Sequence, residues 1–530
     1  MEKITVLDST LRDGAQAEGI SFSVTDKINI CRALDELGVA YIEAGNPASN
    51  PKDIEFFKEV AAVSFQNAVL TAFGSTRRKG VSCEEDANLA ALVGAGTEAV
   101  SIFGKSWDFH VTEILKATKE ENLAMIADTV AYLKANRKKV IFDAEHFFDG
   151  YKNNPTYAME TVKAAERAGA DIVVLCDTNG GCFPDEIAGI VRAVKAELGC
   201  EVGIHAHDDT GCGVANSIAA VSAGAGHVQG TLVGYGERCG NANLSTIVAD
   251  LQLKRGVQCV AGDLKRLTEI SRRVAEISNV RLSRGMPYVG KSAFAHKAGM
   301  HIDGVNKSSR SFEHVPPESV GNERRFLMSE VAGRSTVLEK IRRVDPSVKK
   351  NDPVTAKVIE RIKEMEFRGY QFEGAEASFE LLIRKQLGTY KPFFSLEKFK
   401  TIGEQRVGED FAPAAAIVKV LVNGNAEITG AEGNGPVNAL DVALRKALER
   451  FYPSLKEFKL TDYKVRILDS RETSSAVTRV LIESSDKEDV WTTVGVSRDI
   501  IEASLIALTD ALEYKLIKDE ERKVQREDTE

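Results

Sequence analysis

Gly203-Ile204-His205-Ala206-His207-Asp208-Asp209 places two histidines two residues apart at the end of an apolar run. Side chains alternate between the two faces of a β-strand, so His205 and His207 are expected to project to the same side. Two neighbouring imidazoles form part of a metal site, which also needs a carboxylate, a further ligand and an open position for substrate. The pair alone is equally compatible with two polar side chains at a strand end.

The run that carries these histidines is the seventh of eight β-rich runs. The runs are Ile4–Thr10, Val39–Gly45, Val69–Gly74, Ala99–Gly104, Lys139–Glu145, Asp171–Asp177, Glu201–His207 and His227–Leu232. Helical patterns lie between them, such as Thr25–Leu37 and Pro184–Leu198. Eight strands alternating with helices predict an α/β fold with a (β/α)8 TIM barrel over residues 1–256. An open doubly wound sheet is the alternative, but no GxGxxG follows the first strand.

Length and composition indicate a globular protein of several domains. The chain has 530 residues, of which 43% are hydrophobic and 28% charged. Its net charge of −9 argues against nucleic-acid or anionic-membrane partners, and no apolar run is long enough to span a membrane. The N-terminus shows no signal peptide, and the eight cysteines form no CxxC pair, so we expect reduced thiols and a cytoplasmic location.

Polar residues follow the predicted strands, where a TIM barrel places its chemistry. Asp13, after the first strand, is the carboxylate expected to join His205 and His207, and Asn241, after the eighth, can add a carbonyl oxygen. Such a mixed oxygen and nitrogen site suits Zn²⁺, Mn²⁺ or Mg²⁺. It can hold a chelating 2-oxo acid and polarise its ketone.

Other residues at the same strand ends suggest further roles. Arg12 can face a developing alkoxide, or form a salt bridge that seals the barrel mouth. Glu145 can be a base, an acid or an orienting group, and Thr178 can donate to a substrate carboxylate. Asp177 is expected to be a hydrogen-bonding scaffold residue.

Three motifs, in order along the chain, resemble the family of 2-isopropylmalate, homocitrate and citramalate synthases. They are Asp8-Ser9-Thr10-Leu11-Arg12-Asp13-Gly14-Ala15-Gln16, the segment Gly203–Asp209, and Gly236-Glu237-Arg238-Cys239-Gly240-Asn241-Ala242-Asn243. The likeness covers essentially the whole chain up to its charged tail. It is greatest to the citramalate-forming branch, through Ala17–Ser23, Phe73–Arg78 and Ser106–Val111.

This resemblance implies a metal-dependent acyltransferase that condenses acetyl-CoA with a 2-oxo acid. Pyruvate is the first choice of substrate, with 2-oxoisovalerate and 2-oxoglutarate as alternatives. The roles implied are metal ligands for Asp13, His205, His207 and Asn241, catalysis for Arg12 and Glu145, and substrate contacts for Arg12, Thr178 and His110. A lyase on a related barrel and a catalytically inactive sensor are the other classes considered, but such lyases lack the C-terminal module described below.

Residues 257–400 are predicted to be mainly helical, with helices at Leu264–Ile277 and Ala356–Phe367. Between them, Ala295–Val305 is expected to be a mobile polar loop. The resemblance implies a small helical subdomain that covers the barrel of a partner subunit, where His301 assists the activation of acetyl-CoA. Phe312 stands where the family usually has a tyrosine, which puts a hydroxyl role there in doubt.

Residues 401–517 are predicted to form a duplicated β–β–α module, with helices at Val437–Phe451 and Arg498–Leu516. Glycine turns before these helices would expose N–H groups to a carboxylate. The candidate effector residues are Gly433, Gly435, Val437, Val494 and Gly495. The resemblance implies isoleucine as an inhibitor and a homodimer or higher oligomer, whereas the alternative is a pure dimerisation module. Residues 518–530 are expected to be a disordered charged tail.

Overall fold

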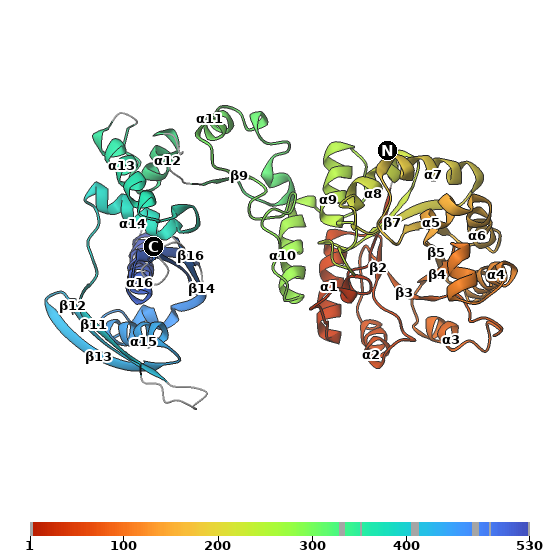
Figure 1. Cartoon of the computed structure of the whole chain (residues 1–530), viewed down its shortest axis with the longest axis horizontal. Coiled ribbons are helices and arrows are strands. Elements are labelled where there is room, and N and C mark those ends of the chain that lie inside the picture. The colour runs from red at the N-terminus through yellow and green to blue at the C-terminus, as the bar shows by residue number, and fades with distance from the viewer. Residues whose placement is uncertain are drawn as a thin grey trace. The chain divides into compact units, whose positions relative to one another are not determined.

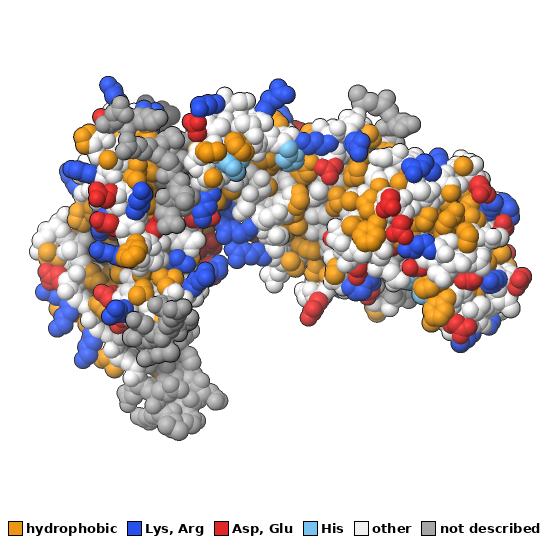
Figure 2. Space-filling view, turned by 45° about the horizontal axis from the view of Figure 1, so that its top comes forward, with side chains coloured by type: hydrophobic (Ala, Val, Ile, Leu, Met, Phe, Trp, Pro, Cys, Tyr) orange, Lys and Arg blue, Asp and Glu red, His pale blue; other side chains and the backbone are white. Residues whose placement is uncertain are grey.

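The computed structural model describes residues 4–327, 334–349, 352–403, 413–468, 476–486 and 489–527. The chain divides into two compact units, Met1–Phe294 with Glu313–Arg324, and Ala295–Phe312 with Arg325–Glu530. None of the helices in the described ranges has the length and apolar character needed to cross a membrane. Acidic, basic and apolar side chains are interspersed over the face of the barrel unit that Figure 2 shows.

The first unit contains a closed barrel of parallel strands, which confirms the predicted fold (Figure 1). The strand β1 closes the barrel by pairing with β8, where Leu7 lies opposite Gln229. The strands are β1 (Thr5–Asp8), β2 (Tyr41–Glu43), β3 (Val69–Ser75), β4 (Ala99–Lys105), β5 (Lys139–Glu145), β6 (Ile172–Asp177), β7 (Glu201–Ala206) and β8 (His227–Gly230). The helices are α1 (Val24–Leu37), α2 (Pro51–Val60), α3 (Ala87–Gly94), α4 (Lys119–Ala135), α5 (Phe147–Asn153), α6 (Pro155–Arg167), α7 (Pro184–Glu197), α8 (Gly213–Ser222), α9 (Leu244–Ala249) and α10 (Leu267–Ile277).

Local sequence signals explain where these helices begin and end. The helix α1 begins with a capping box, in which Ser23 Oγ accepts from the N–H of Asp26 and the Asp26 carboxylate accepts from the N–H of Ser23. It ends at Gly38, whose φ of 82° suits glycine. Pro184 occupies the first turn of α7, as the sequence predicts.

The interior of the barrel changes from apolar to polar toward the C-terminal ends of the strands. Leu7, Ile141 and Ile172 belong to one buried apolar cluster. Two residues further along β5 than Ile141, and therefore on the same face, lies Asp143. Because polar side chains replace apolar ones at this end, the fold concentrates charged groups at the barrel mouth.

The second unit begins with a segment whose structure corrects a prediction. Residues 295–305 are not a loop, because the strand β9 (Ala295–His296) pairs with β10 (Arg325–Phe326) and the helix α11 spans Gly299–Lys307. The predicted helix at Ala356–Phe367 is confirmed within α13. The further helices of this region are α12 (Arg334–Val344), α13 (Pro353–Phe367) and α14 (Glu376–Leu387).

The C-terminal module is duplicated as predicted, but each repeat is β–β–β–α rather than β–β–α. The first sheet carries the helix α15 along it in Figure 1, and α16 packs on the second. The repeats are β11 (Ser395–Gly403), β12 (Ala414–Val422), β13 (Asn425–Gly433) and α15 (Pro436–Leu448), followed by β14 (Lys459–Ile467), β15 (Thr478–Ser485), β16 (Val490–Ser497) and α16 (Ile500–Glu527).

Two further expectations, one for this module and one for the tail that follows it, are wrong. Gly495 lies within β16 rather than in a turn before a helix, and a Cβ there would lie 1.9 Å from the carbonyl oxygen of Ala503. The absence of a side chain at Gly495 therefore permits the close packing of α16 against β16. The neighbouring Val494 is fully buried. The expected tail is helical as far as Glu527, and residues 528–530 lie outside the described ranges.

Candidate active site

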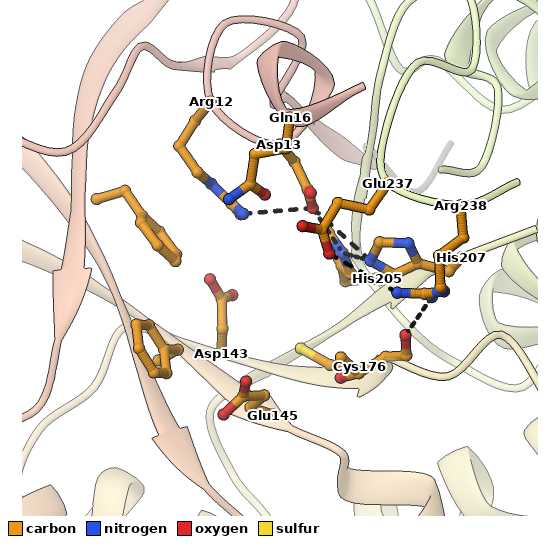
Figure 3. Close-up of a pocket in the computed structure, with 13 residues that line it drawn as sticks. Arg12, Asp13, Gln16, Asp143, Glu145, Cys176, His205, His207, Glu237 and Arg238 are labelled. Carbon is orange, nitrogen blue, oxygen red and sulfur yellow. Dashed lines mark hydrogen bonds and ion pairs between the residues drawn. The ribbon is translucent and has the colours of Figure 1, made fainter. Parts of the chain in front are cut away.

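Three of the predicted metal ligands converge at the barrel mouth. The Nε2 of His205 lies 3.3 Å from Asp13 Oδ2 and 3.3 Å from His207 Nε2, and His207 Nε2 lies 3.8 Å from the same carboxylate oxygen (Figure 3). All three side chains are buried. Among the described residues they are the group whose geometry suits a metal ion.

The turn after β1 holds Asp13 in this position. The carbonyl oxygen of Ser9 accepts from the N–H groups of Arg12 and Gly14, and the Ser9 hydroxyl accepts from the N–H of Asp13 at 3.3 Å. The side chain of Asp8 accepts from the N–H of Thr10 at 2.8 Å. The polar side chains of the motif therefore fold the turn that presents the carboxylate.

Asn241 lies beside this cluster through a backbone bridge with His207. Its Nδ2 donates to the carbonyl oxygen of Tyr235 at 3.1 Å, whereas its buried Oδ1 accepts no hydrogen bond from any described residue. A Cβ at Gly236 would lie 2.2 Å from that Nδ2, so the glycine makes room for the amide. A buried acceptor without a donor is costly unless a cation is bound, and the residues therefore fit a metal ion.

The protonation states also favour a cation. Burial raises the pKa of Asp13, but Arg12 and the two histidines outweigh it and hold that pKa well below its usual range. Burial, followed by the charge of His205, lowers the pKa of His207 to about 4. Burial lowers the pKa of His205, but the Asp13 carboxylate raises that pKa by more, so the net shift is upward. The cluster therefore attracts one positive charge, which a proton or a metal ion can supply.

Arg12 is fixed beside the cluster by two carboxylates and a ring. Its Nε donates to Glu43 Oε2 at 2.7 Å, its Nη1 lies 3.3 Å from Asp13 Oδ2, and its guanidinium lies 3.8 Å from the centroid of Phe73. Glu43 is fully buried and also accepts from the Ser9 hydroxyl at 2.5 Å. The salt bridge considered as an alternative exists, and it holds the guanidinium at the cavity wall.

These residues line a cavity of about 270 Å³ at the barrel mouth (Figure 3). Arg12, Glu145 and Thr178, which the sequence singles out, lie in its wall together with the metal cluster. The wall consists of Arg12, Asp13, Gln16, Phe73, Phe103, Asp143, Glu145, Cys176, Thr178, His205, His207, Glu237 and Arg238.

Glu145 and Thr178 have partners that orient them. Glu145 forms an ion pair with Lys105. The hydroxyl of Thr178 accepts from the N–H of His146 at 2.9 Å, which leaves its hydrogen able to point to a ligand. Arg238 binds the Asp209 carboxylate through Nε and Nη2, both at 2.9 Å, and donates to the Thr178 carbonyl oxygen. The ends of β6 and β7 are thereby tied to the loop after β8.

Comparison with known proteins agrees with this geometry. The HMGL-like family matches residues 3–274, the homocitrate synthase post-HMGL domain-like family matches 288–369, and the LeuA allosteric (dimerisation) domain matches 373–516. The chain belongs to the HMGL-like family. This confirms the family resemblance that the sequence motifs predict.

Curated relatives within this family cover nearly the whole chain. The (R)-citramalate synthases of Geobacter sulfurreducens and Aquifex aeolicus are each 52% identical over 522 residues, which is 98% of this chain and 99% of theirs. A "Probable 2-isopropylmalate synthase" of Methanosarcina mazei is 31% identical over 514 residues, covering 96% of this chain and 95% of that protein. The chain is thus more similar to these two citramalate synthases than to that relative.

Of the residues predicted for catalysis and substrate binding in this HMGL-like chain, two do not line the cavity. His110 stacks on Trp107, with ring centroids 5.1 Å apart, and lies 4.2 Å from the ring of His146. Burial, then the charges of His146 and Lys105, lower its pKa. His301 lies on α11 in the second unit, where its ring stacks on Phe312 at 4.2 Å. Both roles stay predictions.

Sequence reasoning missed several residues of the site. Phe73 and Phe103 form a stacked pair in the cavity wall, with centroids 5.5 Å apart. Asp143 also lines the cavity, and burial, followed by the charge of Glu43, raises its pKa to about 6. It lies two residues before Glu145 on β5, so the period of two that pairs the histidines also identifies it. Asp177 accepts from the N–H groups of Gly181 and Cys182, which agrees with its predicted scaffold role.

Proposed function

We propose that this chain is an (R)-citramalate synthase, which condenses acetyl-CoA with pyruvate and releases CoA. The observation that carries the proposal is the convergence of Asp13, His205 and His207 beside Arg12 in one cavity. The 52% identity to two curated (R)-citramalate synthases supports this reaction over that of the relative at 31%. A cavity of about 270 Å³ with two aromatic rings in its wall suits a small 2-oxo acid.

Asp13, His205, His207 and Asn241 are the residues that would hold a divalent cation. Their carboxylate, imidazole and amide donors match Mn²⁺, Zn²⁺ or Mg²⁺. When bound, the cation polarises the ketone of the 2-oxo acid as a Lewis acid. The unsatisfied Oδ1 of Asn241 and the ionised Asp13 support this set of ligands.

The condensation joins the methyl carbon of acetyl-CoA, after it loses a proton, to C2 of pyruvate. The ketone oxygen of pyruvate becomes an alkoxide and is then protonated, and water cleaves the thioester to give citramalate and CoA. Arg12, already desolvated and oriented by Glu43, stabilises the negative charge on that oxygen. The hydroxyl of Thr178 donates to the pyruvate carboxylate, since its own oxygen accepts from His146.

Two further groups act on protons. Glu145, oriented by its ion pair with Lys105, is the carboxylate placed to exchange protons in the cavity. The family resemblance assigns the activation of acetyl-CoA to His301, supplied by a second copy of the chain. His110 is an additional substrate contact of this proposal, from its place in the rim motif Ser106–Val111.

We also propose that the C-terminal module regulates the activity of the barrel. The match to the LeuA allosteric (dimerisation) domain supports a homodimer. By the family resemblance, citramalate lies on the biosynthetic route to isoleucine, and isoleucine, as the end product of that route, is the proposed inhibitor. Of the candidate effector residues, Gly433 ends β13, Gly435 precedes α15 and Val437 lies in its first turn. A helix start of this kind can hold the carboxylate of an amino acid.

The regulatory proposal is tested by titrating the full-length enzyme with isoleucine. Val437→Asp is expected to weaken inhibition while the uninhibited kcat is unchanged, because a carboxylate would repel that of isoleucine. Val490→Asp, at a residue 66% exposed on β16, is the control. Full-length enzyme indifferent to isoleucine would leave the module a dimerisation device.

The reaction is tested by following the CoA thiol released from acetyl-CoA. Release should depend on both pyruvate and a divalent cation. His207→Ala should abolish it and lower the metal content, whereas His227→Ala, a buried histidine on β8, should keep the metal content of the parent. A His207→Ala variant with normal metal content and rate would refute the site.

A further inference from the structure

A chain of buried hydrogen bonds runs beneath the metal cluster. The Nδ1 of His205 lies 3.0 Å from Gln229 Oε1, and Gln229 Nε2 donates to Asp143 Oδ1 at 2.9 Å. The Ser101 hydroxyl donates to the other oxygen of Asp143 at 2.6 Å. These residues come from β7, β8, β5 and β4, and Gln229 and Ser101 are fully buried. This series of hydrogen bonds therefore crosses the barrel interior from Ser101 to the metal ligand His205.

The chemistry of these residues determines the direction of each hydrogen bond. An ionised Asp143 offers acceptors alone, and it receives one hydrogen bond from Ser101 and one from Gln229. The amide of Gln229 must then turn its NH₂ group toward Asp143 and its carbonyl oxygen toward His205. An amide oxygen cannot donate, so Nδ1 of His205 has to carry the proton.

The position of that proton determines which nitrogen of His205 can bind a metal. With the proton on Nδ1, the lone pair of a neutral imidazole is on Nε2, the atom that lies 3.3 Å from Asp13 Oδ2. Gln229 also lies opposite His205 in the register of β7 and β8, which fixes its distance from the ring. In the opposite tautomer an N–H would point into the cluster and exclude a cation.

We propose that Gln229 is a positioning residue, which holds His205 in the Nδ1–H tautomer and so sets the affinity of the cluster for its divalent cation. This inference rests on the metal site of the proposed function. Groups that accept from metal-bound histidines typically contribute about 10- to 100-fold in metal affinity. If Gln229 only filled space in the barrel, a side chain of the same shape without an acceptor would leave the metal affinity unchanged.

The test compares Mn²⁺ binding by the full-length parent and three variants, using calorimetry at pH 8 without substrate. Gln229→Met keeps a similar volume but removes the acceptor, and we expect the dissociation constant to rise about 10- to 100-fold. His227→Met is the matched control, since His227 is buried two residues earlier on the same strand and face and pairs with Thr5 instead. It should bind within about twofold of the parent, because it leaves the acceptor of His205 in place.

Gln229→Glu distinguishes the acceptor from the shape, and serves if the methionine variant does not fold. An oxygen still faces Nδ1, and the new carboxyl group shares one proton with the Asp143 carboxylate that it faces, so affinity should stay close to that of the parent. Parental affinity in Gln229→Met, or equal losses in the Met and Glu variants, would overturn the role of Gln229. A parent that binds no Mn²⁺ would instead overturn the proposed metal site.

Discussion

Replacing Arg12 by methionine should reveal two separate roles of its guanidinium. The Nε of Arg12 lies 2.7 Å from Oε2 of the fully buried Glu43, so Arg12→Met leaves that carboxylate without the cation that faces it. Removing one member of a buried ion pair costs about 3–5 kcal/mol, and we expect the free energy of unfolding of the barrel to fall by that amount. Loss of one preorganised donor to the alkoxide should also lower kcat by about 10²–10³-fold.

The double variant Arg12→Met/Glu43→Gln separates the two roles. Removing the Glu43 charge should restore most of the lost stability, while kcat stays low because the donor to the alkoxide is still missing. Urea unfolding can be followed by the fluorescence of Trp107 in the barrel, in a Trp491→Phe background that removes the other tryptophan. Recovery of kcat together with stability would show that Arg12 acts only as a structural ion pair, and would refute the catalytic role.

Three further predictions follow from the structure. Thr178→Val should raise the KM for the 2-oxo acid about tenfold or more, since it removes a hydrogen bond to a charged group, and an unchanged KM in steady-state assays would contradict this. Dialysis against EDTA should abolish turnover and Mn²⁺ should restore it; full activity in metal-free enzyme would exclude the proposed site. Burial raises the pKa of Glu513 from 4.5 to about 7, so the folded state holds this proton more tightly and stability should fall as pH rises through that range. Glu513→Gln should remove this part of the pH dependence of the urea midpoint, and an unaltered profile would count against it.

The barrel and the core of its site are predictable from the sequence, because both depend on simple periods. Strands alternate with helices, and the spacing of His205 and His207 places both on one face of a strand. Their convergence with Asp13 follows once the strands close into a barrel, since the C-terminal ends of all strands then meet at one mouth.

Other features depend on packing that no local pattern records. The place of Gly495 in β16 is determined by the close approach of α16, whereas its sequence suggests a turn. Most residues of β11 are exposed, and they lack the clear alternation of buried and more exposed residues that β12 shows. The sequence of β11 therefore does not indicate a strand. The hydrogen-bond partners of Glu43 and Gln229 could not be predicted from the sequence either, because they come from segments distant along the chain.

The most direct test of the proposed function is a competition in one reaction. The full-length enzyme is supplied with acetyl-CoA, Mn²⁺ and equal low concentrations of pyruvate, 2-oxoisovalerate and 2-oxoglutarate, and the products are separated by chiral chromatography. Their initial ratio gives the ratio of the kcat/KM values. We predict that (R)-citramalate dominates, whereas an excess of 2-isopropylmalate or homocitrate would contradict the assignment.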